Sequence, residues 1–306
     1  MQHFINIQTC PAKIIKELID RSNYWKSVTN QGPCNKILHN KTIGMIFEKP
    51  STRTRIAFEV AITKLGGTSL FLNSKDLQLS RNEPIKDTAR VLNSYLDGLV
   101  IRTYKHDVLD EFIKYSNIPI INGLSEQEHP CQTIADLLTM QELLGNLAGK
   151  KIVFVGRYNN VSHSLMMGSL KMGMTFALLI PTNDCPNTTV LEQAQEIAKN
   201  NNGNLLITQD IKEALTESSI IYTDVWQSMG DETQLNRINL MCYQINSNLL
   251  KQAEKDIKVM HCLPAKRNEE ITDEVLESHQ KTIFQQADNK LYSHMAILEK
   301  FVHLTN

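Results

Sequence analysis

The chain has 306 residues, a length that suggests two domains at about 150 residues each. Its 32 Lys and Arg residues balance 33 Asp and Glu residues, so the formal net charge is -1, without the basic excess of a nucleic-acid-binding protein. Hydrophobic residues make up 42% of the chain, yet apolar runs such as residues 176–180 are far shorter than the roughly 18 residues that cross a bilayer. These values predict a globular chain that binds neither nucleic acid nor membrane.

The six cysteines are widely spaced, without a C-x-x-C pair: Cys10, Cys34, Cys131, Cys185, Cys242 and Cys262. This spacing suggests neither a disulfide framework nor a zinc site. The first residues also lack the charged region, apolar core and small-residue cleavage site of a secretory leader. We therefore expect a cytoplasmic protein with reduced thiols.

Short β-rich runs alternate with helical patterns along most of the chain, which is typical of βα units around parallel sheets. In the first half, strands are expected at residues 42–47, 68–72, 98–103 and 118–121. A second series is expected at residues 151–155, 175–180, 204–208, 219–223 and 257–261. The sequence therefore predicts an α/β fold with two doubly wound parallel-sheet domains of similar size, joined by interdomain helices.

A helical pattern lies between the two series of strands. Its apolar stripe ends at two helix-stopping glycines and consists of Ile134, Leu137, Leu138 and Leu144, followed by Gly145 and Gly149. We place the domain junction there, between residues 1–145 and 146–287. Apolar residues at helical spacing also predict a terminal amphipathic helix within residues 288–306, which we expect to pack back across the junction.

The segment Ser-Thr-Arg-Thr-Arg at residues 51–55 follows a predicted strand and leads into a predicted helix over residues 56–65. A helix N-terminus presents unpaired N–H groups and a partial positive charge, and three hydroxyls and two guanidiniums crowd this one. The pattern predicts an anion site. Arg53 and Arg55 are two positions apart and point to different sides of a helix, so we expect at most one to bind ligand while the other braces the protein.

Polar residues also lie at other predicted strand ends, where open α/β sheets bind ligands. Arg102 closes one strand, and His129 precedes the junction helix with Gln132 three positions further on. Asp224 follows another strand, and Cys262 follows the last strong one. These positions favour a ligand site built from separated polar groups of two domains.

Standard nucleotide and hydrolase motifs are missing from the sequence. Gly156 stands alone where a dinucleotide-binding fingerprint needs G-x-G-x-x-G, which disfavours a nucleotide-binding oxidoreductase. Neither G-x-x-x-x-G-K-[ST] nor G-x-S-x-G occurs. The remaining interpretation is a site that recognises phosphate without a Walker loop.

Three motifs together resemble the carbamoyltransferase signatures: Ser-Thr-Arg-Thr-Arg at 51–55, His-Pro-Cys-Gln at 129–132 and His-Cys-Leu-Pro at 261–264. The element Asp224-x-x-x-Ser228-Met229-Gly230 is similar to that of the ornithine carbamoyltransferases. The resemblance runs through most of the chain. It implies an enzyme that transfers a carbamoyl group from carbamoyl phosphate to the δ-amine of L-ornithine, giving citrulline and phosphate, in arginine biosynthesis or, in reverse, arginine catabolism. It further implies no metal and no organic cofactor, and a homotrimer or a multiple of trimers with active sites at subunit interfaces.

The resemblance also implies roles for individual residues. The carbamoyl phosphate set is Ser51, Thr52, Arg53, Thr54, Gln78 from a neighbouring subunit, Arg102, His129, Gln132, Cys262, Leu263 and Lys290. The ornithine set is Asn160, Asp224, Ser228 and Met229. The catalytic set is Arg102, His129, Cys262 and Asp224. Thr54, Arg102 and His129 suit the stabilisation of a tetrahedral oxyanion, and ligands on two domains imply closure between them.

Three positions depart from the family pattern. Arg157 stands where the family usually has Asp, Lys290 where Arg is usual, and Ser80 where Gly is common. Lys keeps the charge of Arg but loses its planar fork, so we expect phosphate contacts there to be weaker or remade. Ser80 bears on the conformation of the loop that carries Gln78.

Two other functions stay open at this point. One is a carbamoyltransferase for aspartate, N-acetylornithine or putrescine, although these relatives lack the Ser-Met-Gly element. The other is a silent binding protein that keeps the fold and the ligand but not turnover, an alternative that Arg157 and Lys290 motivate.

Overall fold

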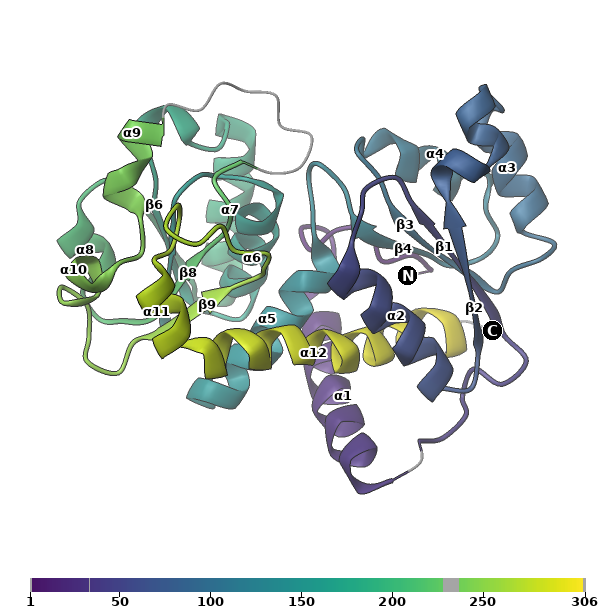
Figure 1. Ribbon diagram of the computed structural model, residues 1–306, viewed down its shortest axis with the longest axis horizontal. Helices are drawn as coiled ribbons and strands as arrows, with labels where there is room; N and C mark the ends of the chain where they lie inside the picture. The colour runs from purple at the N-terminus through teal and green to yellow at the C-terminus, as the bar shows by residue number, and fades with distance from the viewer. Residues whose placement is uncertain (1, 33, 228–236, 305–306) are drawn as a thin grey trace. The chain divides into compact units, whose positions relative to one another are not determined.

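The computed structural model describes residues 2–32, 34–227 and 237–304 (Figure 1). The chain divides into two compact units: unit 1 comprises Met1–Leu138 and Asn289–Asn306, and unit 2 comprises Thr139–Asp288. Both boundaries fall inside helices, namely α5 (Pro130–Leu144) and α12 (Gln280–Leu298). Among the described residues, no helix is long and apolar enough to cross a membrane.

Unit 1 is built on a parallel sheet with the strand order β2-β1-β3-β4. The strands are β1 (Thr42–Phe47), β2 (Thr68–Asn73), β3 (Gly98–Arg102) and β4 (Ile120–Leu124). Each lies where the sequence predicts a strand, but β4 begins two residues later than expected. Pro119 lacks an N–H for the ladder, so the strand begins beyond it.

Unit 1 also contains α1 (Ala12–Gln31), and the helices α2 (Thr52–Lys64), α3 (Ile85–Leu92) and α4 (Asp107–Tyr115) lie beside its sheet (Figure 1). Every residue of β3 and β4 is buried, as expected for strands covered on both faces. A core that includes Ile46, Leu99, Ile101 and Phe112 packs between the sheet and the helices.

Unit 2 is built on a second parallel sheet with the order β7-β6-β5-β8-β9. Its strands are β5 (Lys151–Val155), β6 (Thr175–Leu179), β7 (Asn204–Thr208), β8 (Ser218–Thr223) and β9 (Lys258–His261). Its helices are α6 (Asn160–Lys171), α7 (Thr188–Asn201), α8 (Ile211–Leu215), α9 (Arg237–Leu240), α10 (Ser247–Leu250) and α11 (Asp273–Ser278). The predicted α/β fold with two doubly wound parallel sheets is confirmed.

The prediction for the start of the terminal helix is wrong. The sequence predicts it from Asp288, whereas α12 begins at Gln280 and continues as one π-helical turn over Glu299–His303. Its first turn, Gln-Lys-Thr, is polar and carries no apolar stripe, so the periodic signal begins only later.

Each sheet has one point where the strand order reverses, and ligands of open α/β sheets bind beside such points, at the carboxyl ends of the strands. In unit 1 this point lies between β1 and β3, and in unit 2 between β5 and β8. The segments that follow these four strands contain most of the predicted site residues.

Candidate active site

The anion-binding segment follows β1 and begins helix α2. Ser51 occupies the N-cap position with extended backbone, and its hydroxyl caps no helix N–H. Thr54 is buried one turn further on. Arg55 pairs with Glu59 at 2.9 Å and lies over the ring of Phe71, 3.4 Å from its centroid. The expectation that one of the two arginines braces the protein is therefore confirmed for Arg55.

Arg102 ends β3 at a point where the pairing with β4 changes register, between Ile101 and Arg102. Such an irregularity re-aims a side chain, and the arginine is nine-tenths buried. The adjoining loop is tied to the end of β1 by Glu48, whose Oε2 accepts from Thr103 Oγ1 at 2.6 Å and from the Tyr104 N–H at 2.9 Å. The segments after β1 and β3 are thus held together by a carboxylate that sequence reasoning missed.

His129 sits at the start of α5, after a turn organised by Ser125. The Ser125 N–H donates to the Glu128 carbonyl at 2.9 Å, and the Glu128 N–H donates to Ser125 Oγ at 3.3 Å. Burial lowers the pKa of His129 well below its ordinary value, with Lys290 and Arg102 adding positive charge nearby. The imidazole is therefore neutral at pH 7 and can donate one N–H without carrying charge.

A buried chain of polar contacts connects Lys290 to two other predicted site residues. Lys290 Nζ donates to Thr54 Oγ1 at 3.0 Å and to Gln132 Oε1 at 2.8 Å, and Gln132 Nε2 donates to Asp136 Oδ1 at 2.8 Å. All four side chains are buried. These contacts fix which end of the Gln132 amide faces Lys290, and they show that a Lys fits where the family usually has Arg.

Two further residues of unit 1 clarify the motifs. Cys131 in His-Pro-Cys-Gln is buried, donates to the Asn122 carbonyl at 3.3 Å and has its pKa raised by burial to about 12, so it packs as an inert thiol. Ser80 Oγ donates to the Leu77 carbonyl at 2.7 Å, which closes the short turn that carries the exposed Gln78. A serine is thus compatible with this loop.

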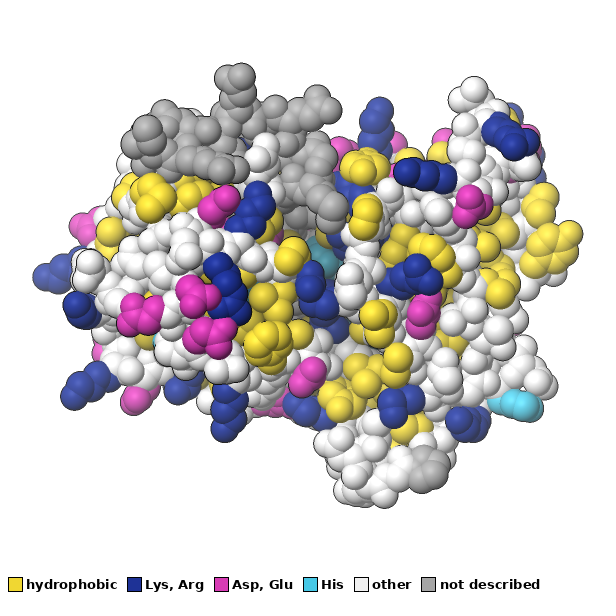
Figure 2. All heavy atoms as spheres, viewed as in Figure 1, with side chains coloured by type: hydrophobic (Ala, Val, Ile, Leu, Met, Phe, Trp, Pro, Cys, Tyr) yellow, Lys and Arg dark blue, Asp and Glu magenta, His cyan; other side chains and the backbone are white. Residues whose placement is uncertain are grey.

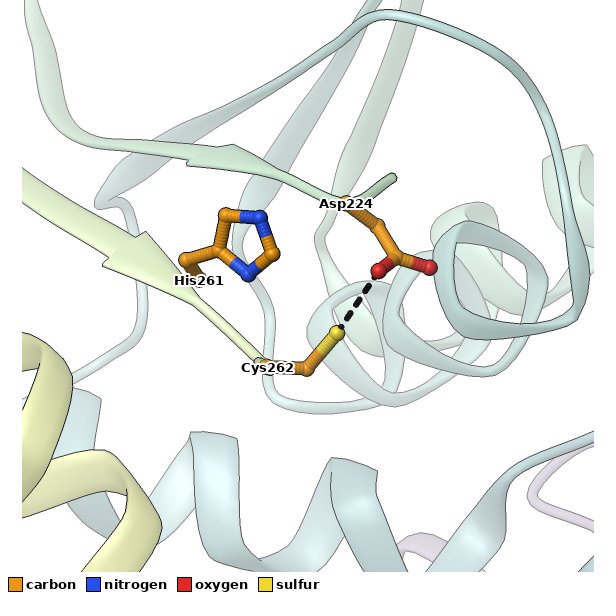
Figure 3. A group of neighbouring side chains, drawn as sticks. All are labelled: Asp224, His261 and Cys262. Carbon is orange, nitrogen blue, oxygen red and sulfur yellow. Dashed lines mark hydrogen bonds between the residues drawn. The ribbon is translucent and has the colours of Figure 1, made fainter. Parts of the chain in front are cut away.

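In unit 2, Asp224 follows β8 and is held from two sides. Its Oδ2 accepts from Asn159 Nδ2 at 2.9 Å, and its Oδ1 accepts from Cys262 Sγ at 3.0 Å. Figure 3 shows the thiol pointing at the carboxylate. Asn159 also caps α6 through bonds from the N–H groups of Val161 and Ser162, so the turn after β5 and the end of β8 share one side chain.

His261 orients the segment after β9. Its Nδ1 accepts from the Leu263 N–H at 2.9 Å, which leaves Nε2 to donate to Glu270 Oε1, also at 2.9 Å. Leu263 has a positive φ of 57°, a conformation that costs energy for a non-glycine residue and that the bond to His261 stabilises. Glu270 also accepts from the Lys266 N–H at 2.7 Å, so it closes the loop on both sides.

The ligand atoms of Asp224, His261 and Cys262 lie within 4.8 Å of one another, a spacing that suits a metal ion (Figure 3). Both imidazole nitrogens of His261 are already engaged with the protein, so a metal would have to displace one of those bonds. We interpret the three residues as a hydrogen-bonded cluster. The expectation of a metal-free site stays a prediction.

The remaining predicted residues are distributed as follows. Thr52 and Arg53 lie in the first turn of α2, and Asn160 is the first residue of α6, next to the cap Asn159. Ser228 and Met229 lie outside the described residues. Sequence reasoning missed Asn159, Glu48 and Glu270. Of these, only Asn159 has a local signal, the Asn-x-x-Ser capping pattern.

The geometry defines two half-sites, one cationic and hydroxyl-rich at a helix N-terminus, the other a buried carboxylate beside a thiol. Two family models match the chain: the aspartate/ornithine carbamoyltransferase carbamoyl-P binding domain over residues 2–142, and the Asp/Orn binding domain over residues 148–301. The chain belongs to the aspartate/ornithine carbamoyltransferase family.

Within this family the similar proteins are ornithine carbamoyltransferases. The chain is 50% identical to that of Methanosphaera stadtmanae over 86% of this chain and 88% of the relative. It is 46% identical to that of Oceanobacillus iheyensis over 93% and 89%. The solved ornithine carbamoyltransferase of Pyrococcus furiosus superposes with a TM-score of 0.93 at 40% identity, covering 98% of this chain and 97% of that one.

Proposed function

We propose that this enzyme transfers the carbamoyl group of carbamoyl phosphate to the δ-amine of L-ornithine, giving L-citrulline and phosphate. The observation that carries the choice of acceptor is the buried carboxylate of Asp224. A carboxylate attracts the α-ammonium of ornithine, whereas it would repel the additional carboxylate of aspartate. The family match and the similar ornithine carbamoyltransferases support the same reaction.

We propose that residues 1–145, with the helix over 288–306, bind carbamoyl phosphate and that residues 146–287 bind ornithine. Phosphate binding is assigned to the N-terminus of α2, through Ser51, Thr52, Arg53 and Thr54, with Gln78 contributed by a neighbouring subunit. Ornithine binding is assigned to Asn160 and Asp224, together with Ser228 and Met229.

The proposed chemistry is direct attack of the neutral δ-amine on the carbamoyl carbon. Negative charge develops on the carbonyl oxygen, where Thr54, Arg102 and His129 would stabilise it. A neutral His129 suits this role because its imidazole donates an N–H hydrogen bond. Unlike an imidazolium, it is too weak an acid to give that proton to the phosphate. Phosphate then leaves with the electrons of the broken C–O bond and takes up the proton that the amine nitrogen loses.

The remaining carbamoyl contacts come from both units. We assign the orientation of the carbamoyl NH2 to Gln132 and the Leu263 carbonyl, and Lys290 supports Gln132 and Thr54. Cys262 is assigned a place beside the attacking amine, because its thiol already contacts Asp224.

We propose a homotrimer, or a multiple of it, for the assembled enzyme. Exposed apolar side chains support this proposal: Ile56 and Val60 on α2, Leu70 on β2 and Tyr95 after α3 are 37% to 71% exposed. Figure 2 shows hydrophobic side chains, in yellow, at the surface of unit 1. Apolar surface of this kind commonly marks an interface. A cytoplasmic location stays a prediction.

The function is tested by a colorimetric citrulline assay with carbamoyl phosphate at about pH 8, a choice of pH that follows from the high pKa of an alkyl amine, about 10.4. Ornithine, aspartate, putrescine and N-acetylornithine are offered in parallel, and we expect product from ornithine alone. Product from another amine would overturn the acceptor assignment. Silence with all four, together with carbamoyl phosphate binding in a calorimeter, would instead indicate a silent binding protein.

A further inference from the structure

Arg157 departs from the family pattern, and its guanidinium holds two segments together. Nε and Nη2 donate to the two carboxylate oxygens of Asp184 at 2.9 and 3.3 Å. Nη1 donates to the Trp226 carbonyl at 3.1 Å. The arginine and aspartate side chains are only 19% and 16% exposed, so water screens this pair weakly.

The Trp226 side chain lies close to Gly156, the residue before Arg157. The indole is 2% exposed, and a Cβ built on Gly156 would lie 3.4 Å from its Cδ1 and Nε1 atoms. Gly156 has a φ of 128°, which side-chain-bearing residues rarely adopt. Gly156 thus leaves room for the indole beside the turn after β5, and the next residue, Arg157, holds the Trp226 carbonyl.

Asp224, two residues before Trp226, is tied to the same turn. Asn159 donates to its carboxylate, so Asn159 and Arg157 bond to the two ends of the segment that runs from Asp224 to Trp226. The segment is thus anchored at both ends to the β5–α6 turn. Removal of one anchor would leave the other in place and let the peptide after Asp224 shift.

Only an arginine satisfies this geometry. Its planar fork bonds both oxygens of a carboxylate and still presents another N–H to a carbonyl, whereas a lysine ammonium offers a point charge without that fork. The positive charge is matched by Asp184, so the pair adds little net charge near the half-site. The contacts therefore favour a role in positioning over direct attraction of the substrate.

We propose that Arg157, paired with Asp184, is a positioning residue for the α-amino end of ornithine. It holds the Trp226 carbonyl so that Asp224 keeps the direction in which it accepts the α-ammonium. This inference rests on the proposed function, because it names a device that sets ornithine affinity in that same site. Arg157 makes no contribution to carbamoyl phosphate binding.

The test compares Arg157→Gln, Arg157→Lys and Asp184→Asn with a matched control, Arg267→Gln. Arg267 also belongs to unit 2 and also forms ion pairs, with Asp273 and Glu277, but on the surface. We expect Arg157→Gln to raise the KM for ornithine about tenfold while kcat and the KM for carbamoyl phosphate change less than twofold. Arg157→Lys should recover little of the loss, Asp184→Asn should give a smaller rise, and Arg267→Gln none.

A binding measurement separates positioning from loss of stability. Norvaline carries the α-amine and α-carboxylate of ornithine without the δ-amine, so calorimetry with carbamoyl phosphate present reports the α-end alone. Its Kd should rise by the same factor as the KM for ornithine in Arg157→Gln. An unchanged norvaline Kd, or equal losses toward both substrates, would overturn the inference. A lower melting temperature with unchanged KM would do the same and show a merely structural role.

Failure of the inference and failure of the proposed function remain distinguishable. If the unaltered enzyme makes no citrulline, the proposed function fails. If the unaltered enzyme makes citrulline and Arg157→Gln keeps its ornithine KM, only the positioning role of Arg157 fails.

Discussion

The two half-sites hold charge in opposite ways. In unit 1 the buried ammonium of Lys290 donates to two neutral acceptors, the Thr54 hydroxyl and the Gln132 amide oxygen, beside the proposed phosphate contacts. In unit 2 the cation of Arg157 is matched by Asp184, and the charge left for a ligand is the Asp224 carboxylate. The difference teaches that two similar sheets can be adapted to different ligands by the charged side chains placed at the ends of their strands, a cation in unit 1 and a carboxylate in unit 2.

The largest expected effect follows from removal of the buried cation that ends β3. We expect Arg102→Met to lower kcat by about 10² to 10³, the usual cost of losing one oxyanion donor. Steady-state citrulline formation at saturating concentrations of both substrates measures the loss.

The control for Arg102→Met is Arg55→Met, which removes an arginine of the same unit that pairs with Glu59. We expect its kcat to stay within a few-fold of the unaltered enzyme. If both variants lost activity equally at full structural integrity, the cationic half-site would not be the source of transition-state stabilisation.

Neutralising the carboxylate of unit 2 should have the next largest effect. Asp224→Asn keeps the shape but not the charge, and a hydrogen bond to a charged group contributes about 1.5 to 3 kcal/mol. We therefore expect kcat/KM for ornithine to fall about 100-fold, while the KM for carbamoyl phosphate stays nearly unchanged. Initial rates with each substrate varied in turn measure both constants.

Arg53→Ala provides the mirror image of Asp224→Asn, since it should raise the KM for carbamoyl phosphate and spare that for ornithine. Equal loss toward both substrates in both variants would contradict the division of labour between the units.

A smaller effect is expected from substitution of Lys290, which stands where the family usually has Arg. Lys290→Met removes the donor for Thr54 and Gln132, and we expect kcat/KM for carbamoyl phosphate to fall about tenfold, in line with about 1.4 kcal/mol. Lys290→Arg keeps the charge and should stay within about threefold, so a tenfold loss in this variant would show that the pocket demands lysine.

The sequence predicts the parts of the site that are local. The hydroxyls and guanidiniums at residues 51–55 stand next to one another. Arg102 ends a strand and Asp224 follows one, and the apolar run of each strand is evident. For such residues, the rule that ligands bind at the carboxyl ends of the strands of an open sheet is enough to predict a place in the site.

Contacts between distant segments could not be predicted in this way. Lys290 and Thr54 are 236 residues apart, and Asn159 and Asp224 are 65 apart, so only the folded chain shows that they meet. The start of α12 escaped prediction for a different reason, because its first turn is polar. Arg157 was recognised as a departure, but its partner Asp184 had no signal in the sequence.

The smallest expected effect is a pH dependence of stability that arises in unit 1. Burial lowers the pKa of His129 and of His294 well below the ordinary value, with Lys290 adding to both shifts. The folded state therefore keeps both rings neutral, while the unfolded chain takes up protons below about pH 6.5. Since the unfolded state binds more protons, the free energy of unfolding falls as the pH is lowered through this range, by about 1.4 kcal/mol per histidine between pH 7.5 and 5.5.

Urea unfolding at a series of pH values measures this slope. His294 stacks on Phe58 with ring centroids 3.7 Å apart and lies outside the proposed substrate contacts, so His294→Gln can remove one titrating group while His129 remains. We expect this variant to lose about half of the slope that the two histidines contribute. Ser293→Ala, on the same helix and equally buried, should lower stability without changing the slope, because no proton is involved. A slope unchanged in His294→Gln would mean that burial beside Lys290 on α12 does not hold this ring neutral.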